Sequence, residues 1–178
     1  MAEDAGNPVF AVSPQQLSRQ QFLTQFGGIY EHSAWVALAV LAAGLSPADD
    51  QINNLADRMA TIVDAAGSKR QLALLCAHPE LAGKLAIDGR LTADSTAEQA
   101  SAGLNRCSPE EFAAFQALNT AYGEKFGYPF IIAVRGLTRA DILAAFRRRI
   151  DNDERTEFAT ALAEVHKIAR LRLEMLAG

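Results

Sequence analysis

The stretch SPEEFAAFQALNTAYGEKFG, residues 108–127, carries in order every sequence signal of an α-helix. Ser108 can cap a first turn in which proline takes the first helical position and Glu111 can reach back to the cap. Apolar side chains follow at helical spacing, at Phe112, Phe115, Leu118, Tyr122 and Phe126. Gly127 then stands where helices commonly end. We therefore expect one helix across this stretch.

The same helix-start and spacing signals recur along the chain. A hydroxyl residue is followed three positions later by an acid or amide at Ser18 and Gln21, Ser46 and Asp49, Ser68 and Gln71, Ser95 and Glu98, and Thr138 and Asp141. Apolar stripes at helical spacing run through residues 52–63 and 158–176. Residues 130–134 resemble a strand, but they are too short and solitary to make a sheet. The patterns predict an all-α fold, a single compact domain of about seven to nine helices around one core. It would span residues 14–178, after an irregular lead-in at residues 1–13.

Composition excludes several classes of protein. Hydrophobic residues make up 49% of the 178 residues and charged residues 21%, which is typical of a globular protein and excludes wholesale disorder. The net charge of -4 gives no general attraction to nucleic acid. The densest basic cluster, residues 147–149, is soon followed by acidic residues at 151, 153 and 154, so we interpret it as a solvated helix end. Cys76 and Cys107 form no CxxC pair and predict neither a disulfide framework nor a zinc site.

The sequence also bears on location and on metals. The longest apolar stretch, Trp35 to Ala43, is shorter than the roughly 18 residues that a membrane span needs. The first residues lack a signal-peptide core, and the last three are not a peroxisomal address. We therefore expect the cytoplasm of a bacterium. No pair among His32, His78 and His166 has the spacing of a helical metal site, so no metal is expected.

Three polar or aromatic clusters interrupt this helical pattern: HPELAGK at residues 78–84, STAEQ at 95–99 and FGYPFII at 126–132. His78 precedes a proline, which ends a helix and leaves an imidazole suited to proton delivery or to an interaction with the helix dipole. Glu98 either completes a capping box with Ser95 or serves as an acid/base partner. The amide of Gln99 offers both a donor and an acceptor. A proton carrier, an acid/base partner and an amide are the groups that a small catalytic pocket needs.

An irregular segment and a buried arginine each have a structural and a functional interpretation. The segment of residues 127–132, if extended, either plugs the core or presents unpaired backbone groups to a flat heterocyclic ligand, with Arg135 just beyond as a solvent-facing residue or an anion contact. Arg172 lies seven positions after Val165 on the last apolar stripe, so it should point inward. A buried guanidinium needs a carboxylate or carbonyl partner. That partner is either an Asp or Glu side chain of another helix or an anionic substrate, which arginine can bind bidentately.

At these clusters the chain resembles the family of 2-oxo-4-hydroxy-4-carboxy-5-ureidoimidazoline (OHCU) decarboxylases, which form (S)-allantoin at the end of urate degradation. The resemblance runs from Gln21 to Leu176. Its motifs are FGGIYEHS at residues 26–33, HPELAGK at 78–84, STAEQASAGL at 95–104, KFGYPFI at 125–131 and EVHKIARLRL at 164–173. Each motif alone is weak, but their order and spacing are specific.

The resemblance implies that His78 is the catalytic histidine and Glu98 its partner acid. It also implies substrate contacts, largely through backbone groups, at Pro79, Ser95, Thr96, Ala97, Glu98, Gln99, Phe130, Ile131, Ile132, Ala133 and Val134. Arg172 falls where the family's carboxylate-gripping arginine is expected, with Arg135 as the alternative. Family members are all-helical, cofactor-free and usually homodimeric. The rival hypotheses are a non-catalytic helical interaction domain and a helical metalloprotein.

Overall fold

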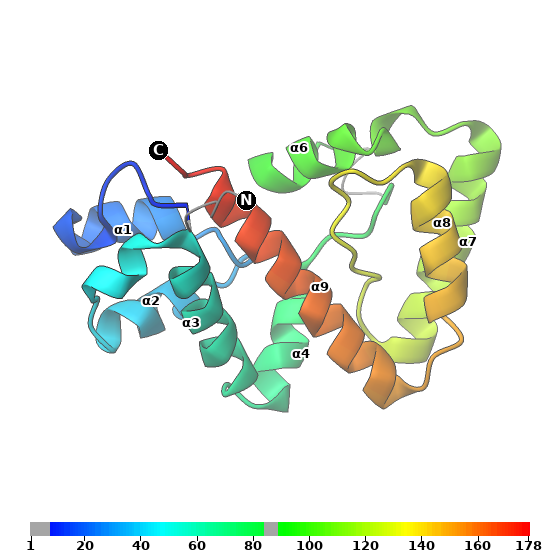
Figure 1. Cartoon of the computed structure of the whole chain (residues 1–178). Helices are drawn as coiled ribbons and strands as arrows, with labels where there is room; N and C mark the ends of the chain where they lie inside the picture. Colours follow the sequence, from blue (N-terminus) through cyan, green and yellow to red (C-terminus); the bar gives the residue numbers. More distant parts are fainter. Residues whose placement is uncertain (1–7, 84–88) are drawn as a thin grey trace, which may run out of the picture. The chain divides into compact units, whose positions relative to one another are not determined.

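The computed structural model describes residues 8–83 and 89–178, and in these ranges every regular element is a helix. The α-helices, followed along the chain in Figure 1, are α1 (Arg19–Phe26), α2 (Trp35–Ala42), α3 (Ile52–Asp64), α4 (Ser68–Ala77), α6 (Ala93–Ser101), α7 (Pro109–Phe126), α8 (Arg139–Arg149) and α9 (Glu154–Glu174). Short 3-10 helices are η1 (Pro14–Gln16), η2 (Pro47–Asp50) and η3 (Leu104–Arg106). The all-α prediction is confirmed. None of the described helices is long and apolar enough to cross a membrane.

The helix boundaries follow the capping signals at most positions. Capping boxes form at Ser18 with Gln21, Ser46 with Asp49, Ser108 with Glu111, and Thr138 with Asp141. At Ser108 the side chain accepts from the Glu111 N–H at 3.1 Å, and the Glu111 carboxylate accepts from the Ser108 N–H at 2.9 Å. The Ser108 N–H, followed by the Arg139 guanidinium that donates to the same carboxylate, holds the pKa of Glu111 below its usual range. Gly127 ends α7 at a φ of 78°, the left-handed conformation that glycine adopts without strain.

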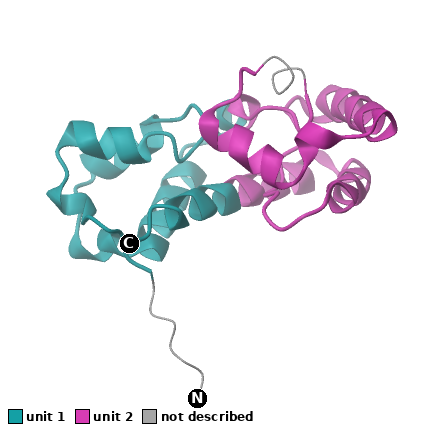
Figure 2. Cartoon of the chain, turned by 90° about the horizontal axis from the view of Figure 1, so that it is seen from above, with its two compact units in different colours: residues 1–74, 166–178 teal, residues 75–165 magenta. Residues whose placement is uncertain are grey.

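Contacts divide the chain into two compact units, which Figure 2 colours separately: unit 1 is Met1–Leu74 with His166–Gly178, and unit 2 is Leu75–Val165. In unit 1, α2 packs against α1 and α3. Its buried apolar side chains include Phe22, Phe26, Val40, Ile52, Leu55, Met59 and Val63. Of the expected lead-in, residues 1–7 lie outside the described part. Val9 and Phe10 form isolated bridges with Gln51 and Ala177.

Unit 2 is organised around aromatic residues of α7, α8 and the segment between them. Helices α7 and α8 lie side by side (Figure 1). Phe130 stacks on Phe146 with ring centroids 3.9 Å apart, and Tyr122 meets both rings edge-on. The remaining fully buried residues of this cluster include Phe115 and Ile142. The aromatic contacts hold Phe130, the first residue of the segment 130–134, against both helices.

One basic residue is buried in this unit. The expectation of a solvated helix end is wrong for Arg149, which is 5% exposed, although Arg147 and Arg148 are exposed. Arg149 donates to Glu157 Oε1 from Nε at 2.9 Å and from Nη2 at 2.6 Å, and Glu157 is fully buried. The helical period explains the difference, because residue 149 follows Phe146 by three positions and shares its inward face.

We predict that Arg149→Met destabilises the protein by about 3–5 kcal/mol, because it leaves the Glu157 carboxylate buried without its cation. Arg148→Met on the exposed neighbour should change the free energy of unfolding by no more than about 0.5 kcal/mol. Chemical denaturation followed by circular dichroism measures both values. Equal effects of the two substitutions would contradict a buried ion pair.

Candidate active site

His78 lies directly after α4, where the sequence predicts that helix to end. Its backbone N–H donates to the carbonyl of Leu75 at 3.2 Å, and Pro79 prevents the helix from continuing. The residue is 9% exposed, so it is buried and does not lie on an open rim. A histidine held at a helix end, beside a fixed proline, has little conformational freedom left. That is the situation in which an imidazole can deliver a proton to one defined place.

The residue opens onto a cavity of about 380 Å³ within unit 2. Residues 78–80 line it together with Tyr128 and Pro129, which lead into the extended segment 130–134. Burial and the negative charge of Glu157 raise the pKa of Tyr128 to about 12, so its hydroxyl stays protonated near neutral pH. The volume lies within the range of small-molecule sites. The first and third sequence clusters therefore meet at one cavity.

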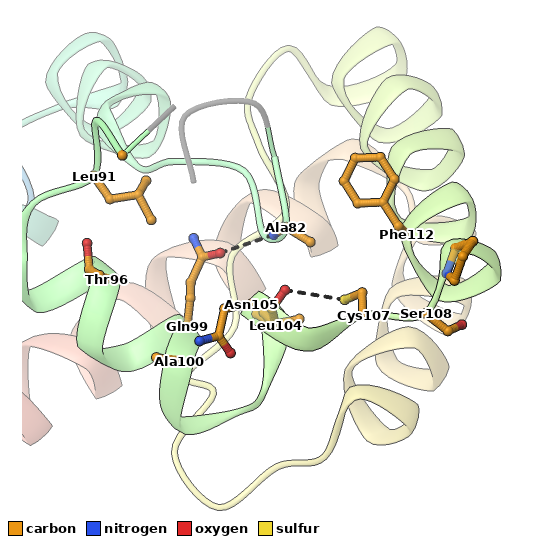
Figure 3. Close-up of a pocket in the computed structure, with 12 residues that line it drawn as sticks. Ala82, Leu91, Thr96, Gln99, Ala100, Leu104, Asn105, Cys107, Ser108 and Phe112 are labelled. Carbon is orange, nitrogen blue, oxygen red and sulfur yellow. Dashed lines mark hydrogen bonds between the residues drawn. The ribbon is translucent and has the colours of Figure 1, made fainter. Parts of the chain in front are cut away.

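The second cluster joins the first through Gln99. Its Oε1 accepts from the backbone N–H of Ala82 at 3.1 Å, and its Nε2 donates to the carbonyl of Glu80 at 3.2 Å. Figure 3 shows this amide pointing at Ala82 beside a second cavity, of about 460 Å³, which Thr96 and Phe112 also line. Both polar ends of Gln99 are thus engaged with the chain that follows His78. Lys84, the last residue of the first cluster, lies outside the described residues.

Helix α6 begins earlier than the sequence pattern suggests. Its N-cap is Thr92, whose side chain accepts from the backbone N–H of Ser95 at 3.2 Å. The capping box between Ser95 and Glu98 is therefore wrong: Ser95 is the third residue of the helix and 4% exposed. Thr92 is the N-cap because its hydroxyl precedes the first helical turn, whereas Ser95 already lies within that turn. Glu98 is half-buried in the second turn and has no capping role, whereas Thr96 and Ala97 are exposed.

Residues 130–134 belong to neither a helix nor a strand, and side chains pair part of their backbone. Arg149 Nη1 donates to the carbonyl of Ile131 at 2.7 Å, and the Ala133 N–H donates to Glu164 Oε2 at 2.9 Å. The Arg149 guanidinium also lies over the Phe130 ring, 4.4 Å from its centroid. Phe130, Ile131 and Val134 are buried, and Ile132 and Ala133 are half-buried. The segment is therefore held in one conformation by charged groups of α8 and α9.

Arg172 belongs to unit 1, whereas the residues that line the His78 cavity belong to unit 2. It points inward as predicted, at 5% exposure, and its Nη1 lies 2.8 Å from Oε2 of Glu31, which is 2% exposed. The same nitrogen also donates to the carbonyl of Gly28 at 3.3 Å. The need for a carboxylate or carbonyl partner is confirmed, and both are present. Arg135, the alternative anion contact, is exposed.

The other histidines lie in unit 1. His166 has both ring nitrogens engaged, Nδ1 with the Tyr30 hydroxyl at 2.9 Å and Nε2 with Asp64 at 3.1 Å. His32 is exposed, with a positive φ of 45°. Over residues 8–83 and 89–178 no three His, Cys, Asp or Glu side chains group together as metal ligands.

Sequence reasoning missed polar residues that support the site. Asn119, which is 5% exposed, donates to the carbonyl of Leu81 at 3.0 Å, and Gln116 donates to the carbonyl of Ala82 at 2.9 Å. A signal for Asn119 was present. It lies four positions after Phe115 and three before Tyr122, so a carboxamide interrupts an apolar stripe just as Arg172 does in the last helix.

Comparison with known proteins places these features in a family. A family model described as OHCU decarboxylase matches residues 15–174. The 2-oxo-4-hydroxy-4-carboxy-5-ureidoimidazoline decarboxylase of Haloferax volcanii is 44% identical over 162 residues, which cover 89% of this chain and 92% of that protein. The uric acid degradation bifunctional protein of Bacillus subtilis is 39% identical over 89% of this chain and 31% of its own length.

The fold agrees with that relationship. A crystal structure of (S)-allantoin synthase matches with a TM-score of 0.72 and 33% sequence identity, covering 93% of this chain and 54% of the other. The chain thus spans about half the length of that protein. The family resemblance carried by the motifs is confirmed over most of the sequence: the chain belongs to the OHCU decarboxylase family.

Proposed function

We propose that this chain decarboxylates 2-oxo-4-hydroxy-4-carboxy-5-ureidoimidazoline to (S)-allantoin in urate degradation. The observation that carries the proposal is the 44% identity to a decarboxylase of that name across 92% of its length. The stereochemistry of the product is supported by the fold shared with (S)-allantoin synthase, of which this chain spans 54%. The buried histidine at a cavity supplies the proton donor that such a product requires.

The reaction can proceed without a cofactor because the substrate holds its own electron sink. The bond between the carboxylate and the hydroxyl-bearing carbon breaks, and carbon dioxide leaves. The electron pair forms a double bond to the neighbouring carbon, whose C=N electrons move to the ring nitrogen, and that nitrogen takes a proton. The resulting enol then loses its hydroxyl proton while the ureido-bearing carbon gains one. In total, the carboxylate form of the substrate consumes one proton.

His78 is the group that we propose delivers the proton to the ureido-bearing carbon. Glu98 would accept the hydroxyl proton or orient His78, and its neighbour Gln99, which is bonded to the chain that follows His78, supports this assignment. A single positioned acid protonates one face of the planar enol, whereas free decay in water protonates both. Stereospecificity is therefore the signature of the enzyme.

Substrate contacts are proposed at Pro79, at residues 95–99 and at residues 130–134. The cavity lined by His78, Pro79 and the residues just before the last segment supports this set, as does the link of Gln99 to the chain after His78. Arg172 remains the proposed anchor of the substrate carboxylate, with Arg135 as the alternative. Its ion pair with Glu31 is a competing, purely structural reason for its burial. A homodimer is proposed on the family resemblance, and a bacterial cytoplasm is proposed as the location that the sequence predicts.

We predict that the protein accelerates the appearance of the (S)-allantoin circular dichroism signal from freshly generated substrate. His78→Asn should lower the rate by about 10²–10⁴-fold, the usual contribution of a general acid, and leave the helical spectrum unchanged. A folded variant that keeps more than about a tenth of the rate would remove His78 from the mechanism, since general acid catalysis contributes far more than that. Wild-type protein without any acceleration would refute the proposed function itself.

Glu98 and Thr92 form a matched pair that separates chemistry from helix stability. Glu98→Gln should lower the decarboxylation rate strongly and change the free energy of unfolding by no more than about 1 kcal/mol, because glutamine keeps the shape of the side chain and Glu98 does not cap α6. Thr92→Ala should instead cost about 1 kcal/mol of stability through the lost cap, with the rate per folded molecule preserved. Rate assays and denaturation curves on both variants check this. A Glu98→Gln variant that loses activity only in proportion to its folded fraction contradicts a catalytic role.

For Arg172 the expected outcome is selective. Arg172→Lys should weaken inhibition by ring analogues that carry a carboxylate and leave the affinity for allantoin, which has none, unchanged, because an ammonium cannot reproduce the bidentate fork. Glu31→Gln provides the comparison, since it removes the charge partner of Arg172 but no proposed substrate contact. Inhibition constants and unfolding free energies are measured for both. Equal affinity losses for both ligand classes, with equal destabilisation by the two substitutions, would assign Arg172 to the ion pair only.

A further inference from the structure

The chain directly after His78 and Pro79 makes a strained turn at residues 80–83. Ala82 has a φ of 49°, in the left-handed region that residues with a side chain rarely adopt. A Cβ at Gly83 would lie 2.7 Å from the Cβ of Glu80, so only glycine fits there without a shift. Such backbone persists only where the surroundings over-determine it, and it concentrates at functional sites.

Three carboxamides provide those surroundings; we call Gln99, Gln116 and Asn119 the amide cradle. Gln99 binds the Glu80 carbonyl and the Ala82 N–H, as Figure 3 shows for Ala82. Asn119 donates to the carbonyl of Leu81, and Gln116 donates to that of Ala82. Three successive carbonyls and one N–H are thus held by side chains from α6 and α7.

Asn119 has an energetic disadvantage in the core, a buried oxygen without a hydrogen-bond partner in the described part of the chain, that core packing alone does not explain. Its Oδ1 is buried and has no hydrogen-bond partner among the described residues, while its Nδ2 reaches the Leu81 carbonyl. An unpaired buried oxygen destabilises a fold, and an apolar side chain of similar shape would avoid it. The donor toward Leu81 is therefore what this position contributes.

We propose that Asn119 and Gln116 are positioning residues for His78, and this inference rests on the proposed function. Only Glu80 and Pro79 separate Leu81 from His78, and the φ of Pro79 is fixed, so a displacement of Leu81 and Ala82 shifts the backbone that carries the imidazole. By locking the strained turn, the cradle fixes the direction from which the proton reaches the substrate. Neither residue touches the substrate in this scheme.

The test uses Asn119→Leu and Gln116→Met, which keep approximate shape and remove the donor. Thr120→Ala is the control, because Thr120 lies on the same helix, is exposed, and donates only to the Gln116 carbonyl of its own helix. We expect kcat to fall roughly ten- to a hundred-fold in each cradle variant, the effect of a misplaced catalytic group, with KM nearly unchanged. The product should also shift from (S)-allantoin toward a racemic mixture, and the control should match wild type.

Product chirality must be measured at enzyme concentrations where uncatalysed decay is negligible. If the cradle variants then give the same product chirality as wild type, with a normal kcat per folded molecule, the amides act only on stability and the proposal is overturned. Should Asn119→Leu fail to fold, Gln116→Met at its half-exposed position decides alone. Amide hydrogen exchange adds a readout that does not depend on activity. Peptides covering residues 78–83 should exchange faster in the cradle variants, and unchanged exchange overturns the cradle even if the wild type proves inactive.

Discussion

Buried backbone N–H and C=O groups need hydrogen-bond partners, and in the described part of unit 2 no sheet offers any. Two irregular segments of that unit, residues 80–83 and 130–134, therefore depend on side chains. Carboxamides of α6 and α7 serve the first segment, and a guanidinium and a carboxylate of α8 and α9 serve the second. Among the buried polar side chains described in unit 2, this requirement explains Gln99, Asn119 and Arg149. They are needed to let the chain leave helical conformation inside the protein.

The cluster around Glu157 shows how firmly one segment can be held. Tyr122 donates to Oε1, Asn152 donates to Oε2 at 2.8 Å, and Arg149 binds the same carboxylate while reaching the Ile131 carbonyl. Burial and the bond to Glu157 raise the pKa of Tyr122, so its hydroxyl remains a donor. A buried charge pair contributes little net stability compared with apolar packing, but its directional bonds allow few arrangements. Fixed placement of residues 130–134 is what the pair supplies.

Sequence reasoning recovers features that depend on local spacing. The helices at 109–126 and 139–149 begin where their capping boxes predict, because a cap involves residues only three positions apart. The same rule fails at Ser95, where Thr92 offers an equivalent hydroxyl one turn earlier and the pattern cannot rank the two. The prediction that Arg149 is solvated is wrong for another reason. Its partner Glu157 lies beyond the end of the helix, and a run of basic residues does not indicate which of them is buried. Tertiary partners decide such cases.

Burial alone does not tell a structural arginine from one that binds a ligand. Arg149 and Arg172 both lie on inward helix faces, and each meets a buried carboxylate and a backbone carbonyl. The five donors of a guanidinium can satisfy both partners at once, so neither arginine requires a ligand to explain its position. The case for His78 differs in kind. A helix terminus, a following proline and a clamped strained turn all act on one residue that lines a cavity, and structural need does not account for their convergence there.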